Sequence, residues 1–292
     1  HKWRQFFLHT TLKAVTPGVG MQLDVGVNLS VNLPLQGAGV AGVIIGDPCV
    51  NSPVGKQWAA CKFGDRFRTI ERLPALINAF VGDKHTDFWG TTGDNFYDRT
   101  GDVTVDFFGR ISLEAKSKLF VTVPGNHDYW TFGHPELANT GDQCGYGHMQ
   151  YYFQDTKAAE AAPAGSGLPP LDTSVDPDAD RPLGLLGCNL PAIANTFWYH
   201  QVGNVGLVGQ SGAYPLEVTR PYMAEACAWL AEQPGLEVGL LVGHWDIPGE
   251  GADLKMAVPA WYSEMMVLPG CSELHGRGML KFVMGHTHCN NP

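Results

Sequence analysis

The stretch GTTGDNFYDRTG, residues 90–101, places a Gly-Asp-Asn turn directly before a phenylalanine and a tyrosine. A turn of this kind uses its glycine for backbone freedom, and its Asp and Asn side chains hydrogen-bond to the local backbone. It has no use for the phenol of Tyr97, which follows Asp94 by three residues. Whether Tyr97 serves packing or chemistry therefore depends on which other residues the fold brings to this turn.

The same arrangement, an apolar strand that ends in a glycine and then a polar residue, occurs five times along the chain. The glycine at each end lets the backbone turn sharply and approach its neighbours closely. The five endings are Gly46-Asp47, Gly93-Asp94, Gly125-Asn126, Gly243-His244 and Gly285-His286. Binding sites of α/β proteins form outside the carboxyl ends of their strands. We therefore predict an α/β fold in which these five ends converge on one point.

Two other segments have the apolar spacing of helices. In residues 66–80 apolar side chains recur at helical spacing, and Pro74 is expected to kink the helix or split it in two. In residues 219–233, Thr219 is the expected N-cap and Pro221 falls in the first turn. Helices between buried strands are typical of the α/β class.

The N-terminal part of the chain has a different pattern. Residues 21–35 alternate apolar and polar side chains with a period of two, as a long half-buried strand or hairpin arm does. We predict a strand-rich extension over residues 1–40 and a main domain over residues 41–292. Residues 155–182 are rich in Ala, Pro, Asp and Gly, which predicts a long surface loop inserted in the main domain.

The composition limits the kinds of partner that the protein can bind. The chain has 292 residues, 44% of them hydrophobic, which suits one large domain or two small ones. Its formal net charge of −10 argues against binding to nucleic acid or to an anionic membrane, because either needs a basic surface. No segment approaches the roughly 18 apolar residues that a membrane span needs. The acidic residues are also available as ligands for hard cations.

Seven cysteines are spread along the chain without a Cys-x-x-Cys pair, which argues against zinc-finger and thioredoxin-like folds. We expect disulfides with one cysteine left over. Pairing of sequence neighbours gives Cys49–Cys61, Cys144–Cys188 and Cys271–Cys289, and leaves Cys227 as the odd thiol. The cysteines and the glycosylation sequon at Asn28 indicate a glycoprotein that is secreted or lumenal.

The polar residues at and near the strand ends are suited to binding two metal ions. They are Asp47, Asp94, Tyr97, Asn126, His244, His286 and His288. Carboxylate and phenolate oxygens suit a hard ion, whereas imidazoles and an amide oxygen suit a borderline divalent ion such as zinc, manganese or ferrous iron. The His-x-His spacing projects both rings from the same side of an extended segment, so each ring could serve a different metal. The carboxylate of Asp94 is placed to bridge the two.

The order of these blocks resembles a known family. Gly-Asp, Gly-Asp-Asn-Phe-Tyr, Gly-Asn-His-Asp, Gly-His and Gly-His-Thr-His follow one another as in the calcineurin-like metallophosphoesterases, over about Val43 to His288. Within that family, GDNFY followed by TG resembles the purple acid phosphatases. The resemblance implies two packed mixed β-sheets flanked by helices, an αββα sandwich. It also implies an acid phosphatase-like enzyme that hydrolyses phosphate monoesters with a metal-bound hydroxide.

The resemblance also assigns roles to individual residues. It implies that Fe(III) is held by Asp47, Asp94, Tyr97 and His288, with Tyr97 as a coloured tyrosinate ligand. It implies that a divalent ion (Zn, Fe or Mn) is held by Asp94, Asn126, His244 and His286. His127 is then the catalytic residue beside the metals, where it contacts the phosphate or protonates the leaving group.

The first motif departs from the family pattern. Purple acid phosphatases usually show Gly-Asp-x-Gly, and here Asp47 is followed by Pro48 and Cys49. Asp65 is a rival for the first metal ligand, and Asp47 is preferred because a buried strand precedes it. Asp128 is expected to support its loop by hydrogen bonds and not to bind metal. The chain starts at His1 and ends soon after the last motif, so we expect a processed or incomplete product. Either a C-terminal part is missing, or another element, such as the strand in the first forty residues, covers that edge of the sheet.

Two other functions remain open on the same residues. The first is a catalytically silent structural or anchoring protein that keeps a phosphatase fold, because a fold does not fix a function. The second is a phosphodiesterase or nucleotidase, which would use the same metal site with a different pocket. Phosphate release by the metal-loaded protein separates the silent protein from the enzymes.

Overall fold

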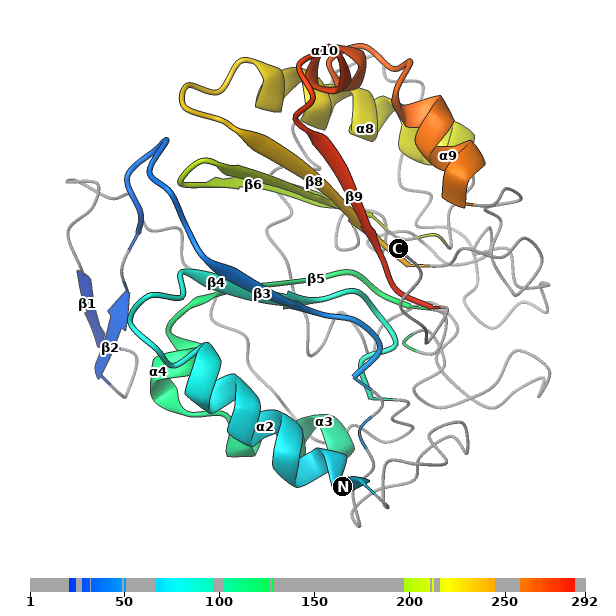
Figure 1. The fold of residues 1–292 in the computed structure, drawn as a ribbon. Helices are drawn as coiled ribbons and strands as arrows, with labels where there is room; N and C mark the ends of the chain where they lie inside the picture. The colour runs from blue at the N-terminus through cyan, green and yellow to red at the C-terminus, as the bar shows by residue number, and fades with distance from the viewer. Residues whose placement is uncertain are drawn as a thin grey trace, which may run out of the picture.

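The computed structural model describes residues 21–24, 28–31, 33–48, 50, 67–96, 102–125, 128, 197–210, 212, 216–244 and 258–286. Two β-sheets lie face to face, and each has helices on its outer side (Figure 1). The predicted α/β fold with two packed sheets flanked by helices is confirmed. No helix in the described parts of the chain is long and apolar enough to cross a membrane.

The first sheet is built from three short parallel strands in the order β3-β4-β5. They are β3 (Gly42–Ile45), β4 (Phe88–Thr91) and β5 (Leu119–Thr122). The register pairs Ile45 with Thr91 and Thr91 with Thr122, so the three carboxyl ends are level. The outer side is covered by α2 (Thr69–Phe80), α3 (Asp102–Arg110) and α4 (Leu113–Lys116) (Figure 1).

The second sheet has four strands in the order β6-β7-β8-β9 and is mixed. They are β6 (Trp198–Val202), β7 (Val205–Gly209), β8 (Val238–Gly243) and β9 (Leu280–Met284). Strand β6 is antiparallel to β7, and the other neighbours are parallel. Gly243 pairs with Met284, which places the residues after β8 and β9 side by side. Helices α8 (Leu216–Ala231), α9 (Val258–Met265) and α10 (Cys271–Gly276) cover the outer side (Figure 1).

The two sheets are held together by a buried apolar cluster between them. It contains Phe88, Val121, Val123, Trp198, Val202, Leu207 and Val242. The fully buried indole of Trp198 also donates a hydrogen bond across the gap to the carbonyl of Thr122, with an N···O distance of 2.7 Å. Each large apolar side chain buried here contributes about 1.5–3 kcal/mol to stability. This packing fixes the carboxyl ends of both sheets relative to each other.

The two predicted helices exist, with corrections to their details. Helix α2 is one uninterrupted element with Pro74 inside it, so the proline does not split it. Helix α8 begins at Leu216, so the expectation of Thr219 as N-cap is wrong. The hydroxyl of Thr219 donates back to the carbonyl of Leu216 at 3.4 Å, as threonines inside helices do. Pro221 consequently lies beyond the first turn.

The predicted cysteine pairing is wrong for two residues. Cys227 in α8 and Cys271 at the start of α10 form a disulfide, with their Cα atoms 4.8 Å apart. Cys227 is therefore not an odd thiol, and Cys271 does not pair with Cys289. The nearest cysteine in sequence is not the disulfide partner here, because α8 and α10 pack against each other on the same side of the sheet. Cys49, Cys61, Cys144, Cys188 and Cys289 lie outside the described residues.

A separate two-stranded hairpin lies apart from both sheets (Figure 1). Strand β1 (Met21–Asp24) pairs antiparallel with β2 (Asn28–Val31). The sequon residue Asn28 begins β2. The predicted surface loop at residues 155–182 lies outside the described residues.

Candidate metal centre

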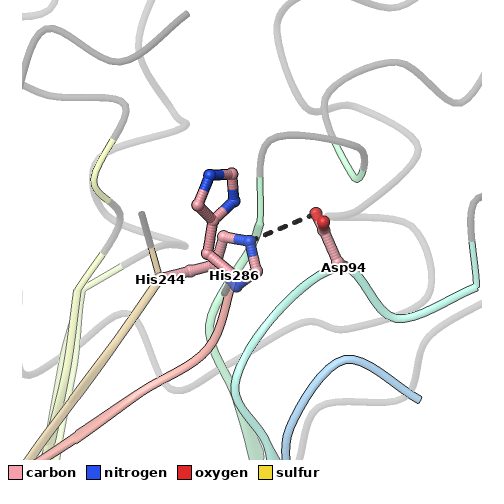
Figure 2. Close-up of side chains that lie close together, drawn as sticks. All are labelled: Asp94, His244 and His286. Atoms are coloured by element: carbon pink, nitrogen blue, oxygen red, sulfur yellow. Dashed lines mark ion pairs between the residues drawn. The ribbon is translucent and has the colours of Figure 1, made fainter. Parts of the chain in front are cut away.

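Three of the predicted ligand residues lie together where the two sheets meet. Asp94 comes three residues after β4, His244 directly after β8, and His286 two residues after β9. One ligand atom from each lies within 4.8 Å of the other two (Figure 2). The ring centroids of His244 and His286 are 5.1 Å apart, with the rings close to perpendicular. The first sheet thus supplies a carboxylate and the second supplies two imidazoles.

The ring of His244 is oriented by two contacts on opposite sides. Its Nδ1 lies 2.6 Å from the backbone carbonyl of Thr92, an acceptor, so Nδ1 carries the hydrogen in this contact. Its Nε2 lies 3.4 Å from Oδ1 of Asp94 (Figure 2). Both side chains are almost completely buried. The backbone of Thr92 therefore sets which ring nitrogen faces the carboxylate.

Asp47 joins the site through the backbone of His286. The amide nitrogen of His286 donates to Oδ2 of Asp47 at 2.8 Å. Asp47, Asp94 and His286 all have positive φ angles, 42°, 50° and 97°. Non-glycine residues in such conformations cost of order 1–3 kcal/mol each and concentrate at functional sites. The strain falls on three of the residues that the sequence marks as candidate ligands.

Glycines allow the strand ends to approach this closely. A Cβ atom on Gly125 would lie 2.3 Å from both the backbone nitrogen and Oδ1 of Asp94. A Cβ on Gly285 would lie 2.6 Å from Nδ1 of His244, and one on Gly93 would lie 2.8 Å from the same atom. Real Cβ atoms do not tolerate such distances, so these positions require glycine.

The electrostatics of the site favour positive charge. Burial by itself would lower the pKa of His244, but the charge and hydrogen bond of Asp94, the charge of Asp47 and the Thr92 carbonyl raise this pKa to about 9. Burial and the charge of Asp94 raise the pKa of Asp128 to about 7, against the hydrogen bonds from Gly125 and Asn95 that lower it. In the metal-free protein, the carboxylates therefore stabilise a proton on His244, where a cation would also be stabilised.

This set of donor atoms fits a divalent ion of borderline hardness. Two imidazoles with one carboxylate is a ligand set used by zinc and similar ions. Two ligand atoms each about 2.1 Å from one tetrahedral ion lie about 3.4 Å apart. The distance from Nε2 of His244 to Oδ1 of Asp94 has that value. The residues present therefore suit a metal ion at this point, with His286 as the third ligand.

Several predicted site residues lie outside the described residues. They are Tyr97, Asn126, His127 and His288, together with Asp65, the rival of Asp47. The sequence reasoning also missed two residues that the structure places beside the site. Thr92 acts through its backbone carbonyl, which no side-chain pattern reveals. Asn95 is part of the quoted turn, and its link to Asp128 depends on the fold.

Comparisons with known proteins give structural similarity only. No protein-family model matches the sequence, and no curated protein is significantly similar to it. A purple acid phosphatase from yellow lupin (Lupinus luteus) seeds is similar in structure, with 13% identity, a TM-score of 0.46 and coverage of 95% of this chain and 45% of that one. PhoD is similar with 10% identity, a TM-score of 0.40 and coverage of 89% and 54%. The chain thus spans about half the length of each protein.

Proposed function

We propose that this protein is a metal-dependent phosphoric ester hydrolase that cleaves phosphate monoesters, in the manner of an acid phosphatase. The observation that carries the proposal is the convergence of Asp94, His244 and His286, from the ends of three strands in two sheets, within 4.8 Å. The order of the five strand-end motifs in the sequence supports the same reading.

The proposed ligands form two sets that share Asp94. His244, His286 and Asn126 complete the set for a divalent ion, and Asp47, Tyr97 and His288 complete the set for Fe(III). Two bound metal ions would polarise the phosphoryl group and supply a nucleophile near neutral pH. The shared carboxylate explains why Asp94 is buried beside His244.

The other roles in the proposed reaction belong to protein side chains. His244 donates Nδ1–H to Thr92, which keeps Nε2 directed at Asp94. Asp47 holds the backbone of His286 and so holds the end of β9 against the end of β3. His127 is the proposed proton donor to the departing alcohol. General acid catalysis of this kind contributes about 100- to 10,000-fold to the rate.

The test is phosphate release from an aryl phosphate by metal-loaded protein from acidic to neutral pH. We expect turnover by the unmodified protein, loss of both metal and turnover in Asp94→Ala, and full metal content with slow turnover in His127→Ala. The control is His275→Ala, at an exposed residue of helix α10, which should change neither quantity. No phosphate release at any pH with both sites loaded would favour the silent structural protein. Release from phosphodiesters alone would favour the phosphodiesterase reading.

Tyr97 gives a separate test of the iron assignment. A tyrosinate bound to Fe(III) absorbs visible light by charge transfer, so we expect a coloured protein whose band disappears in Tyr97→Phe. A colourless protein that contains stoichiometric iron would contradict the proposed binding of Fe(III) by Tyr97 but not the proposed divalent site.

The proposed location is secreted or lumenal. The Cys227–Cys271 disulfide is the structural observation behind this, because disulfides persist in oxidising compartments. Mass spectrometry of the protein isolated from its source should find this pair linked and a glycan on Asn28. Free thiols at both positions together with an unmodified Asn28 would contradict it.

A further inference from the structure

The loops that follow β4 and β5 are tied together by one buried carboxylate. Oδ1 of Asp128 accepts a hydrogen bond from the backbone nitrogen of Asn95 at 3.1 Å. Its Oδ2 accepts from Nδ2 of Asn95 at 3.1 Å and from the backbone nitrogen of Gly125 at 2.7 Å. Three donors from two loops therefore converge on one side chain.

We call the hydrogen-bonded pair of Asn95 and Asp128 the clamp, and both of its side chains are deeply buried. Asn95 is fully buried and Asp128 is 7% exposed. A buried carboxylate is costly unless hydrogen bonds compensate for its lost hydration, so the three donors are a condition for its presence. A further contact lies beneath the clamp, where the hydroxyls of Thr91 and Thr122 are 2.6 Å apart across β4 and β5.

The clamp acts directly on the position of Asp94. Asn95 is the next residue in the chain after Asp94, so fixing its backbone and side chain fixes the turn that carries the carboxylate. Gly125, the other partner of the clamp, lies against Asp94 so closely that a Cβ on it would meet Oδ1 at 2.3 Å. The positive φ of 50° at Asp94 needs such support from its surroundings.

We propose that Asn95 and Asp128 are positioning residues of the metal site, which hold the carboxylate of Asp94 at the distance from His244 and His286 that a shared ion requires. This inference rests on the proposed function. Neither residue touches the ion in this scheme. Loss of such an outer contact typically lowers metal affinity by about 10- to 100-fold.

Cobalt(II) is the probe for the test, because the intensity of its visible d–d bands reports the coordination geometry. Full-length protein is titrated with Co²⁺, and the same samples are unfolded in urea without metal. In Asp128→Asn the new amide has one acceptor oxygen in place of two, so it cannot accept from Asn95 N, Asn95 Nδ2 and Gly125 N together, and its NH2 group faces at least one of these donors. We expect about 10- to 100-fold weaker Co²⁺ binding and altered band intensities in the folded protein.

Two further variants separate positioning from general destabilisation. Asn95→Ala removes the hydrogen bonds from Nδ2 to Asp128 and to Thr122 and keeps both backbone donors to Asp128, so it should fold and still bind Co²⁺ more weakly. Asn95→Asp sets two carboxylates against each other, and adding Asp128→Asn restores a donor between them, so the exchanged pair should recover part of the affinity lost in Asn95→Asp. The matched control is Asp106→Asn, which removes a carboxylate paired with Arg110 on α3 and should leave Co²⁺ binding unchanged.

The outcomes distinguish this inference from the proposed function. If the unmodified protein binds no Co²⁺, the proposed metal site fails. If it binds Co²⁺ and Asn95→Ala binds it with equal affinity and the same bands, the inference is overturned. The inference is also overturned if the loss of Co²⁺ affinity in each variant only matches its loss of stability in urea and the exchanged pair recovers no affinity.

Discussion

The backbone amide of His286 donates a hydrogen bond to Oδ2 of Asp47 over 2.8 Å, although 239 residues separate them in the chain. Asp47 follows β3 in the first sheet, and His286 follows β9 in the second. The contact therefore joins the two sheets at their carboxyl ends. It gives Asp47 a structural role that does not depend on metal.

This contact predicts different effects for two substitutions of Asp47. Asp47→Ala leaves the amide of His286 without its acceptor, and should lower the free energy of unfolding of the metal-free protein by about 1–3 kcal/mol. Asp47→Asn keeps an acceptor oxygen at the same distance from the backbone, so it should lower the free energy of unfolding by less. Urea unfolding of metal-free protein measures both. Equal stability of Asp47→Ala and the unmodified protein would show that the contact contributes nothing.

A methyl group at Gly125 should damage the site. It would lie 2.3 Å from the backbone nitrogen and Oδ1 of Asp94, so Gly125→Ala forces a backbone shift that we expect to cost about 1–3 kcal/mol. Gly109→Ala in α3 is the matched control, because no other atom of the described residues lies within 4 Å of the added Cβ. In a helix, that change should add about 0.5–1 kcal/mol of stability. Thermal unfolding of the two variants should therefore move in opposite directions.

The raised pKa of His244 predicts the pH dependence of metal binding. In the metal-free fold the pKa rises from 6.5 to about 9, so the stabilisation of the protonated ring is fully present below pH 6.5 and is lost as the pH passes about 9. A metal ion must displace this proton. Its affinity should then rise about tenfold per pH unit within that window, with release of about one proton from this group.

Calorimetric titration with Zn²⁺ in buffers of different ionisation enthalpy measures both the affinity and the number of protons released. An affinity that stays level between the two pKa values, with no proton released, would contradict the assignment of His244 as a ligand.

The disulfide between α8 and α10 should stabilise the helical layer. Both sulfurs are buried, and the bond closes a loop between residues 44 apart in the chain. Replacing both cysteines by alanine should lower the free energy of unfolding by about 2–4 kcal/mol. Because the bond lies on the outer side of the second sheet, Co²⁺ binding by the folded variant should stay within about twofold of normal, the scatter expected for independent sites. A large loss of Co²⁺ affinity would show that the helical layer and the site are coupled.

The fold and the strand-end arrangement were accessible from the sequence for a simple physical reason. An apolar run that stops at Gly-Asp or Gly-His marks a strand and its carboxyl end at once, and Asp94, His244 and His286 follow such runs. Parallel strands in register align these carboxyl ends within each sheet, and the packing of the two sheets brings the two sets of ends together. The role of the three residues as metal ligands stays a prediction.

Features that depend on packing between distant segments were not accessible. The partner of Cys227 is set by how α8 and α10 lie on the sheet, not by distance along the chain. Thr219 two residues before a proline has the pattern of an N-cap, but α8 begins at Leu216 and the hydroxyl of Thr219 bonds to the carbonyl of Leu216 inside the helix, which depends on the fold. The carbonyl of Thr92 orients His244 without any signal in the identity of its side chain.

Metal stoichiometry of the purified protein tests the central claim most directly. We predict two metal ions per chain in the unmodified protein, measured by elemental mass spectrometry after loading with iron and zinc. Asp94→Ala should lose both ions, because its carboxylate belongs to both proposed ligand sets, whereas the Asp106→Asn control on α3 should keep two. One ion or none in the unmodified protein, or two ions retained in Asp94→Ala, would contradict a dinuclear site bridged by Asp94.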